Sequence, residues 1–296
     1  MVSKGCENCY AMNVAARFSG PGLAYEGLAR KRSSGKAQWT GVVRVVDEHT
    51  MDPIRWRKPQ RIFVNSMSDL FHEKIAPEEI ARIFAVMGLS MALGRSHTFQ
   101  VLTKRAERMH RLLTSPSFRC MIENEADTLV EDGAAHLGNS MNGVLGSGRN
   151  VGWPFVHVHL GVSCEDQPAA DERIPFLIET PAAVKWISAE PLLGPIEFRT
   201  STGLNRRSLS LWNWWVVVGC ESGRGARPMD IAWPRSIREQ CGFAGMPFFV
   251  KQLPGPNGRV LKDMADFPPD LQIREFPNVA AIATALAAPT SPSPRR

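Results

Sequence analysis

The sequence has no long apolar run and few cysteines. No stretch of its 296 residues approaches the roughly 18 consecutive apolar residues that a membrane span needs, and the N-terminus lacks a secretory hydrophobic region. Six cysteines in 296 residues are too few for a disulfide scaffold, so we expect reduced thiols. These absences predict a soluble, cytoplasmic protein without membrane association.

The composition is that of an ordinary globular chain. Hydrophobic residues make up 44% of it and charged residues 22%, which excludes a mainly disordered, collagen-like or coiled-coil protein. The length is enough to bury a large core. We expect a single domain over residues 1–288, with a flexible glycine-rich insertion at 133–152, and a disordered Pro/Ser-rich tail at 289–296.

The net charge of +6 is concentrated at one end of the chain. Residues 1–61 contain eleven basic and five acidic residues, which accounts for the whole excess. A basic segment attracts polyanions, so we expect nucleic acid as a possible partner of this region. The alternative is a solvated loop face without a partner, because charge bias discriminates weakly.

Six short apolar runs rich in β-branched and aromatic residues recur along the chain. They lack strict alternation, which is typical of strands buried on both faces. Helical segments lie between them: 77–91 follows the first run, and 106–113, 171–178 and 233–241 follow later ones. This alternation predicts an α/β fold, a parallel (β/α) partial barrel of about six to seven strands. The runs are 61–65, 98–102, 156–162, 184–188, 214–219 and 247–250.

Polar side chains follow each of the six runs. The carboxyl ends of parallel strands meet on one face of a barrel, where (β/α) enzymes build their sites, so these residues predict an active-site rim. The alternative is that strand ends are polar only because they reach solvent. The rim residues are Asn65, Ser66, Asp69, Lys104, Glu165, Glu190, Glu221, Ser222 and Lys251.

Cys6 and Cys9 form the one C-x-x-C motif of the sequence. Two thiolates at this spacing are able to bind a metal ion, share an iron–sulfur cluster or cycle as a dithiol. A dithiol motif normally follows a strand, and the five residues before Cys6 leave no room for one. A structural zinc site needs four ligands, and no second pair is present. Cys120 and Cys241 lie in helix-like segments, and we expect them to be buried.

Two other groups of residues are open to a functional or a structural reading. His157 and His159 lie on one face of a predicted strand and have no metal-ligand spacing, so we expect structural roles with satisfied hydrogen bonds. Arg224 and Arg227 lie in a glycine-rich turn suited to anion contact, to capping or to a surface role.

Long blocks spread over the chain resemble one family. The opening VSKGCENCYA (2–11) is similar to that of a family of bacteria and their phages, labelled as phage proteins thirty-seven and sixty-eight or as three-Cys-motif proteins. The other matching blocks are RIFVNSMSDLFHE (61–73), FQVLTKRAERM (99–109), HLGVSCEDQ (159–167), ISAEPLLGPI (187–196), VVVGCESGRGARPM (216–229) and PFFVKQLPGP (247–256).

The resemblance implies a three-cysteine cluster like that of radical S-adenosylmethionine enzymes, on a related partial barrel, with Cys6 and Cys9 as two of the ligands. Family members carry the first cysteine seven positions before the one matching Cys6, which here falls upstream of Met1. An upstream start or a degenerate copy of the motif accounts for this departure. A second departure is Cys220, where the family has glycine.

Two function classes follow. The first is a radical enzyme with a [4Fe–4S] cluster and S-adenosylmethionine, for which we expect nucleic acid as the substrate. The second is a non-catalytic module that binds nucleic acid or a protein partner, with the cysteine pair holding zinc or no metal. For the first class, we expect the rim residues to bind the cofactor or substrate, with salt bridges across the mouth as the alternative. Asn65, Ser66 and Asp69 would bind amino or ribose groups, Glu165, Glu190 and Glu221 would accept from the same groups, and Lys104 and Lys251 would pair with a carboxylate or phosphate.

Overall fold

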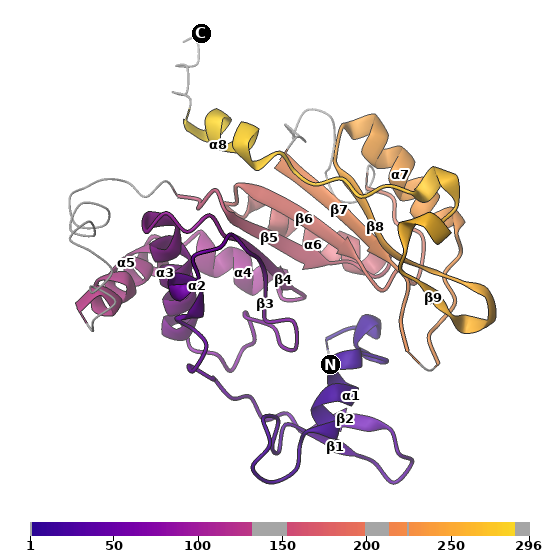
Figure 1. Ribbon diagram of the computed structural model, residues 1–296, viewed down its shortest axis with the longest axis horizontal. Coiled ribbons are helices and arrows are strands. Elements are labelled where there is room, and N and C mark those ends of the chain that lie inside the picture. Colours follow the sequence, from indigo (N-terminus) through magenta and orange to yellow (C-terminus); the bar gives the residue numbers. More distant parts are fainter. Residues whose placement is uncertain (1, 132–152, 199–212, 224, 288–296) are drawn as a thin grey trace.

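The computed structural model describes residues 2–131, 153–198, 213–223 and 225–287. Seven strands form one sheet in the order β3-β4-β5-β6-β7-β8-β9; neighbours from β3 to β8 are parallel, and β9 is antiparallel to β8. The sheet curls into a half-barrel (Figure 1). The strands are β3 (Arg61–Val64), β4 (Thr98–Thr103), β5 (Val158–Ser163), β6 (Val184–Ala189), β7 (Trp214–Gly219), β8 (Phe248–Pro254) and β9 (Val260–Leu261).

The α/β fold with a parallel partial barrel is confirmed, and each of the six predicted runs becomes a strand. The last run was predicted too short, because β8 extends to Pro254. The cause is β9, which pairs with the end of β8 through Leu253 and Leu261. Lys251 therefore lies within β8 rather than after it. The expected insertion at 133–152 and tail at 289–296 lie outside the described residues.

Helices lie between the strands as predicted, with small differences at their ends. The segment predicted at 171–178 begins earlier, at Gln167, because the Asp166 carboxylate caps the helix by accepting a hydrogen bond from the Ala169 N–H (3.1 Å). Of the described helices between β3 and β8, α5 was not predicted. The helices between β3 and β8 are α3 (Pro77–Ala92), α4 (Ala106–Leu113), α5 (Pro116–Glu131), α6 (Gln167–Glu179) and α7 (Ala232–Ala244).

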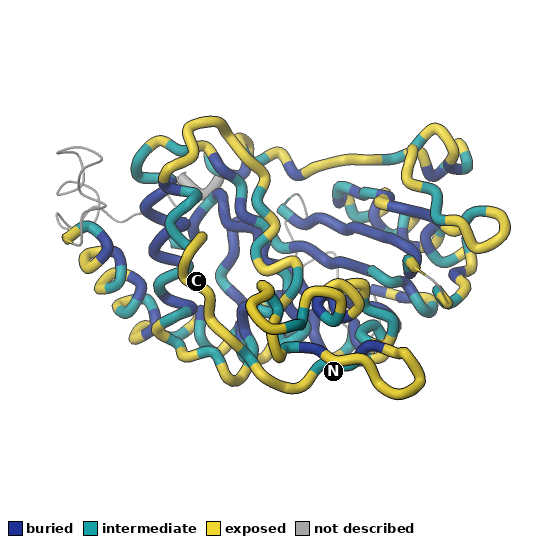
Figure 2. The backbone as a smooth tube through the Cα atoms, turned by 60° about the horizontal axis from the view of Figure 1, so that its bottom comes forward, coloured by how far each residue is buried: buried dark blue, intermediate teal, exposed yellow. Residues whose placement is uncertain are grey.

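The main core lies between these helices and one face of the sheet. It joins side chains of the sheet, such as Leu160 and Val216, to Phe84 of α3 and Ile174 of α6. The central strands β5 and β7 are buried along their whole length (Figure 2). The opposite face of the sheet, here called the inner face, carries a separate cluster of Trp186, Trp215 and Val217 with Leu102 and Phe249. Both faces of the sheet are therefore covered by apolar packing, as the uninterrupted apolar runs predicted.

Gly161 makes the packing of the inner face possible, because the Trp186 ring lies directly over it. A Cβ at Gly161 would lie 2.4 Å from ring atoms of Trp186. The ring is held in place by the hydrogen bond from its Nε1 to the Val101 carbonyl (3.2 Å). We expect Gly161→Ala to lower the free energy of unfolding by about 1–3 kcal/mol through overpacking, measured by denaturant titration.

The matched control for that variant is Gly242→Ala. Gly242 lies inside α7, and nothing is within 4 Å of an added Cβ there. This change is expected to stabilise the protein by up to about 1 kcal/mol, because alanine is the better helix former. Equal unfolding midpoints for the two variants would contradict the assigned role of Gly161.

The C-terminal segment crosses the inner face and bridges the open side of the half-barrel (Figure 1). The Phe276 ring packs against Trp215 and Phe249, with ring centroids 5.6 and 5.2 Å away. On its other side, the Arg61 guanidinium of β3 lies 4.0 Å from the Phe276 centroid. The segment then forms α8 (Val279–Ala287), whose Ile282 packs against Val184.

The N-terminal residues form a small lobe outside the half-barrel. A 3₁₀ turn (Lys4–Cys6) leads into α1 (Tyr10–Arg17), which packs against an antiparallel pair of short strands, β1 (Ala29–Lys31) and β2 (Ala37–Trp39). A short helix, α2 (Asp52–Arg55), returns the chain to the main domain. These two strands were not predicted, because each has three residues and β1 is two-thirds basic.

Two expectations about side chains were wrong. Cys120 is exposed on α5, because it lies on the outer side of that helix, whereas Cys241 is buried as expected. His159 is buried, but neither of its ring nitrogens has a hydrogen-bond partner. His157 donates from Nε2 to the Met87 carbonyl (2.9 Å), and its buried Nδ1 has no partner. Within the described residues, no helix has both the length and the apolarity to cross a bilayer.

Candidate active site at the mouth of the half-barrel

The carboxyl ends of β3 to β8, here called the mouth, carry the predicted rim residues. Residues 4–9, here called the Cys turn, lie over this mouth and include both thiols of the motif. The turn is closed by a hydrogen bond from the Cys9 N–H to the Cys6 carbonyl (3.4 Å). Hydrogen bonds to the ends of β5 and β7, described below, hold the turn. The adjoining residue, Tyr10, contacts the segment after β3, where its hydroxyl donates to the Ser66 carbonyl (3.1 Å).

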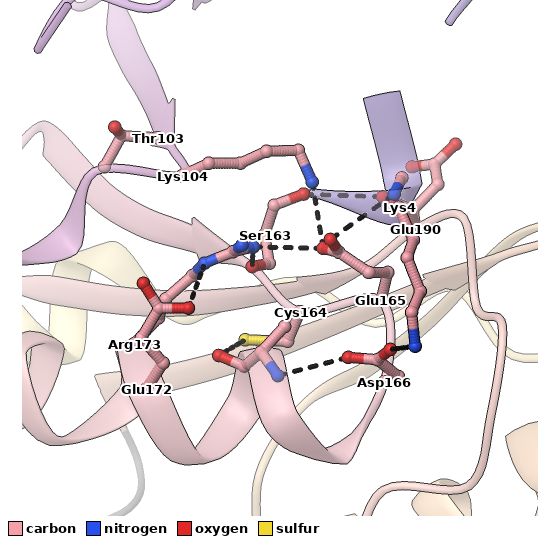
Figure 3. Close-up of polar contacts among 12 residues, drawn as sticks. Lys4, Thr103, Lys104, Ser163, Cys164, Glu165, Asp166, Glu172, Arg173 and Glu190 are labelled. Carbon is pink, nitrogen blue, oxygen red and sulfur yellow. Dashed lines mark hydrogen bonds and ion pairs between the residues drawn. The ribbon is translucent and has the colours of Figure 1, made fainter. Parts of the chain in front are cut away.

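Glu165, which follows β5, is the buried centre of the mouth (Figure 3). Its carboxylate accepts hydrogen bonds from Lys104 Nζ (2.9 Å) and from the Arg173 guanidinium of α6 (3.0 Å). Burial alone would raise the pKa of this carboxyl, but the positive charges of Lys104 and Arg173 outweigh it and lower the pKa to about 2. Glu165 is therefore a permanent anion at neutral pH.

The Cys turn rests directly on this ion cluster. The Gly5 N–H donates to Glu165 Oε1 (3.4 Å), and Lys4 Nζ lies 3.4 Å from the Asp166 carboxylate. A Cβ at Gly5 would lie 3.1 Å from Lys104 Nζ and 3.2 Å from the Glu165 carboxyl carbon. With any other residue at this position, the Lys104 and Glu165 side chains would have to shift by a few tenths of an ångström.

A second set of hydrogen bonds holds the Cys turn at the end of β7. Glu221 accepts from Asn8 Nδ2 (3.0 Å) and from the backbone N–H and Nε of Arg227 (2.8 and 3.0 Å). The Arg227 guanidinium also donates to the Lys4 carbonyl (3.0 Å). Burial would raise the pKa of Glu221, but the hydrogen bonds from Arg227 and Asn8 lower it. The Cys turn is thus fastened at both ends of its length, through Gly5 and through Asn8.

Asp69, after β3, is fully engaged within the protein. It accepts hydrogen bonds from the Thr103 hydroxyl (2.7 Å), the Lys104 N–H (3.2 Å) and the Arg105 guanidinium (3.0 Å). These bonds tie the end of β3 to the end of β4. The Asp69 carboxylate therefore stabilises the mouth by joining these two strand ends.

The remaining rim residues are more accessible. Glu190, after β6, forms an ion pair with Lys251 Nζ (2.7 Å) and lies against Gly219, where a Cβ would be 3.2 Å from the Glu190 carboxyl carbon. Asn65 is exposed and adopts a left-handed backbone (φ 61°), a conformation that asparagine tolerates better than most residues. Ser66 is also exposed, and Ser222 is half-buried beside Glu221.

The other cysteines near strand ends are structural. Cys164 follows β5 and Cys220 follows β7, but both side chains are buried in the core on the helical face of the sheet. Burial raises the pKa of the Cys164 thiol to about 12 and that of Cys220 to about 11. Both thiols are therefore protonated at neutral pH, and neither joins Cys6 and Cys9.

The thiols of the Cys turn do not form a complete metal site by themselves. Across the part of the chain that the structure describes, no group of three or more His, Cys, Asp or Glu side chains is arranged to hold a metal ion. Cys6 and Cys9 are free thiols, both half-buried. Any metal or cluster on this turn needs ligands in addition to these two.

Three residues that build the site were not among the predicted rim residues. Asn8 and Arg227 join the Cys turn to Glu221, and Arg173 neutralises Glu165. Arg173 had a sequence signal, because it is a lone cation on the apolar side of a helix that begins just after the Glu165 strand end. Asn8 lies between the two cysteines, and this position within the motif could have identified it as a residue of the site.

Comparison with known proteins places the chain in a family. The family model described as "Protein of unknown function (DUF5131)" matches residues 1–266. The chain belongs to this family. The match covers the Cys turn, the mouth and all seven strands of the half-barrel, and it ends before the C-terminal segment that crosses the inner face. No curated protein and no solved structure matches the chain.

Proposed function

We propose that this protein is an iron–sulfur enzyme of the radical S-adenosylmethionine type, in which Cys6 and Cys9 are two ligands of a [4Fe–4S] cluster at the mouth of the half-barrel. The observation that carries the proposal is the fastening of the Cys turn to the ends of β5 and β7, together with the contact of the adjoining Tyr10 with the segment after β3. A C-x-x-C motif in a surface loop has no need of such attachments. The parallel half-barrel is a fold whose strand ends form active sites.

Cys6 and Cys9 are the right kind of ligand for the cluster, but they are fewer than the cluster needs. Thiolates are the protein ligands of iron–sulfur clusters, and Cys6 and Cys9 supply two of the three that the sequence resemblance implies. The close approach of the Gly5 backbone to Glu165 fixes the start of the turn. A complete ligand set therefore needs one more thiolate than these two.

When bound, such a cluster supplies one electron to the sulfonium of S-adenosylmethionine. The residues of this chain would position the cluster and the cofactor and shield them from solvent. Glu165, Lys104 and Arg173 hold the turn from one side and Glu221 with Arg227 from the other. The exposed side chains of Asn65 and Ser66 and the half-buried Ser222 would donate to or accept from polar groups of the nucleoside.

The Lys251–Glu190 pair lies on the opposite rim of the mouth from β3 and β4. The Lys251 ammonium is exposed, so it is able to leave the Glu190 carboxylate and pair with a carboxylate of a ligand instead. Because Glu190 and Lys251 neutralise each other, a carboxylate that pairs with Lys251 releases Glu190 to accept from an amino or hydroxyl group.

Replacement of either turn cysteine is expected to abolish cluster binding. After anaerobic reconstitution with iron and sulfide, Cys6→Ala and Cys9→Ala should lose the bound iron, the sulfide and the charge-transfer absorbance of the cluster. Cys120→Ala is the matched control, because Cys120 is an exposed thiol on α5, remote from the mouth. Its cluster content should equal that of the parent.

Two further measurements decide the chemistry. Adding an N-terminal extension with a cysteine seven positions before Cys6 should raise the iron content, because it completes the ligand set. With reductant and S-adenosylmethionine, the reconstituted protein should release 5′-deoxyadenosine. Stoichiometric zinc with no cofactor cleavage, or equal iron in the parent and the double variant Cys6→Ala/Cys9→Ala, would overturn the proposal.

A further inference from the structure

The attachment of the C-terminal segment to the sheet changes after Glu275. This residue is bonded to β8 and β7: its N–H donates to the Phe248 carbonyl (3.0 Å), its carboxylate accepts from the Phe248 N–H (2.9 Å), and its carbonyl accepts from Trp215 Nε1 (3.0 Å). Residues 276–287, which include α8, are here called the strap. Of its described side chains and backbone groups, those of 276–284 form hydrogen bonds only within the strap itself. Packing alone therefore holds the strap on the sheet.

Two side chains supply most of this packing. The Phe276 ring lies between Trp215 and the Arg61 guanidinium, yet it remains 42% exposed. Ile282 of α8 is 1% exposed and packs against Val184 at the start of β6. A helix of nine residues is unstable in water without tertiary contacts, so α8 depends on this one anchor. A segment with so few buried contacts opens at a lower free-energy cost than the strands beneath it.

His159 lies under the strap, between its two anchors. Alternate residues of β5 share a face of the sheet, which puts His159 on the inner face. Its neighbour in register on β6 is Val184, the residue on which Ile282 packs. Burial lowers the pKa of the imidazole, and the charge of Arg61, which holds Phe276, lowers it further. The imidazole is thus close to the residues that both anchors contact.

Closing the strap over His159 carries a cost. The residue is 3% exposed, and neither Nδ1 nor Nε2 has a hydrogen-bond partner in the described part of the chain. A buried polar group without a partner has lost its water and gained nothing in return. Opening the strap gives the imidazole water again, so the contact that covers the inner face also favours its own release. The Cys turn over the mouth differs, because hydrogen bonds to Glu165 and Glu221 hold it.

We propose that the strap is a removable cover on the open side of the half-barrel, whose opening gives small molecules access to His159 and to the Trp215 ring on the inner face (Figure 1). The chain up to Glu275 stays on β8 and serves as the fixed end of the movement. The alternative is a permanent brace that ties β3 to β7 and moves only when the whole domain unfolds. The inference concerns access to the inner face and does not depend on a cluster at the mouth.

The test is the rate at which diethyl pyrocarbonate modifies His159 in the full chain at neutral pH, measured by mass spectrometry. Phe276→Ala, which removes one anchor, is expected to raise this rate roughly tenfold. Asn278→Ala should raise it roughly fivefold, because the Asn278 side chain caps α8 by accepting from the Ala281 N–H (3.1 Å) and touches no strand. The internal control is His157, which is buried on the side of α3 and should keep its rate in both variants.

A matched variant and two outcomes complete the test. Phe18→Ala removes a ring of nearly the same exposure (43%) from the N-terminal lobe and should leave the His159 rate unchanged. Equal rises at His157 and His159 in Phe276→Ala would identify a brace, and an unchanged His159 rate in both strap variants would equally overturn the proposal. The Cys6→Ala/Cys9→Ala protein should modify His159 at the parent rate, so the strap and the proposed function are able to fail separately.

Discussion

Glu165→Leu is expected to lower the free energy of unfolding by about 3–5 kcal/mol, because it removes the buried carboxylate beside Arg173 and leaves this buried charge with only the exposed Glu172 carboxylate, 3.9 Å from its Nε. Arg173 is 2% exposed, so its guanidinium has no route to water, whereas Lys104 reaches the surface more easily. Arg173 would keep its bond to the Ser163 carbonyl (2.6 Å), which does not neutralise it. Denaturant unfolding monitored by circular dichroism measures the loss.

Two further variants show whether the buried charge is the cause. Glu165→Leu/Arg173→Leu should recover most of the loss, because apolar side chains often replace a buried ion pair at little cost. Glu239→Leu is the control for losing a carboxylate: Glu239 is exposed and pairs with Arg238 at the surface, so its change should stay within about 0.5 kcal/mol. A double variant no more stable than Glu165→Leu would contradict the explanation.

Acidification from pH 6.5 to pH 4 is expected to destabilise the protein by about 3 kcal/mol through His159 alone. Burial, followed by the nearby charges of His157 and Arg61, lowers the pKa of His159 to about 4. The native state therefore takes up the proton less readily than the unfolded chain. Stability is complete above the unfolded pKa of 6.5 and falls as the pH drops through that range.

His159→Leu should remove this part of the pH dependence without a cost at neutral pH. Neither ring nitrogen of His159 has a hydrogen-bond partner, so an apolar side chain of similar size loses no hydrogen bond and avoids burying an unsatisfied polar group. His49→Leu is the control, because His49 is an exposed imidazole beside Asp52. If the parent and His159→Leu lose equal stability between pH 6.5 and pH 4, the assignment is wrong.

Most of the barrel was predictable from the sequence, because its central strands β5 to β7 are buried on both faces. Such strands form continuous apolar runs, as in 214–219, and the polar residue after each run marks its carboxyl end. The limits of this signal are visible at β8. Its final residues are held by pairing with β9, a two-residue strand that carries no pattern of its own.

The sequence predicted which residue types lie at the mouth, but not which residues pair with one another there. Glu165, Glu190 and Glu221 were expected to face a cofactor or to form salt bridges, and each forms an ion pair in the structure. Which cation each acid meets depends on strand order and curl, which local sequence does not contain. The attachment of Asn8 to Glu221 joins positions 213 residues apart and follows only from the fold.

A half-barrel does not close, and so it leaves a first strand with one side unpaired. Among the described residues no strand joins β3 on its outer side, whereas the other end of the sheet finishes in β9. Unpaired strand edges invite β-pairing between separate molecules. Here β3 is only four residues long, follows Pro59 closely and carries the exposed charge of Arg61. With the cation of Arg61 also engaged by Phe276, this edge is built to resist intermolecular aggregation.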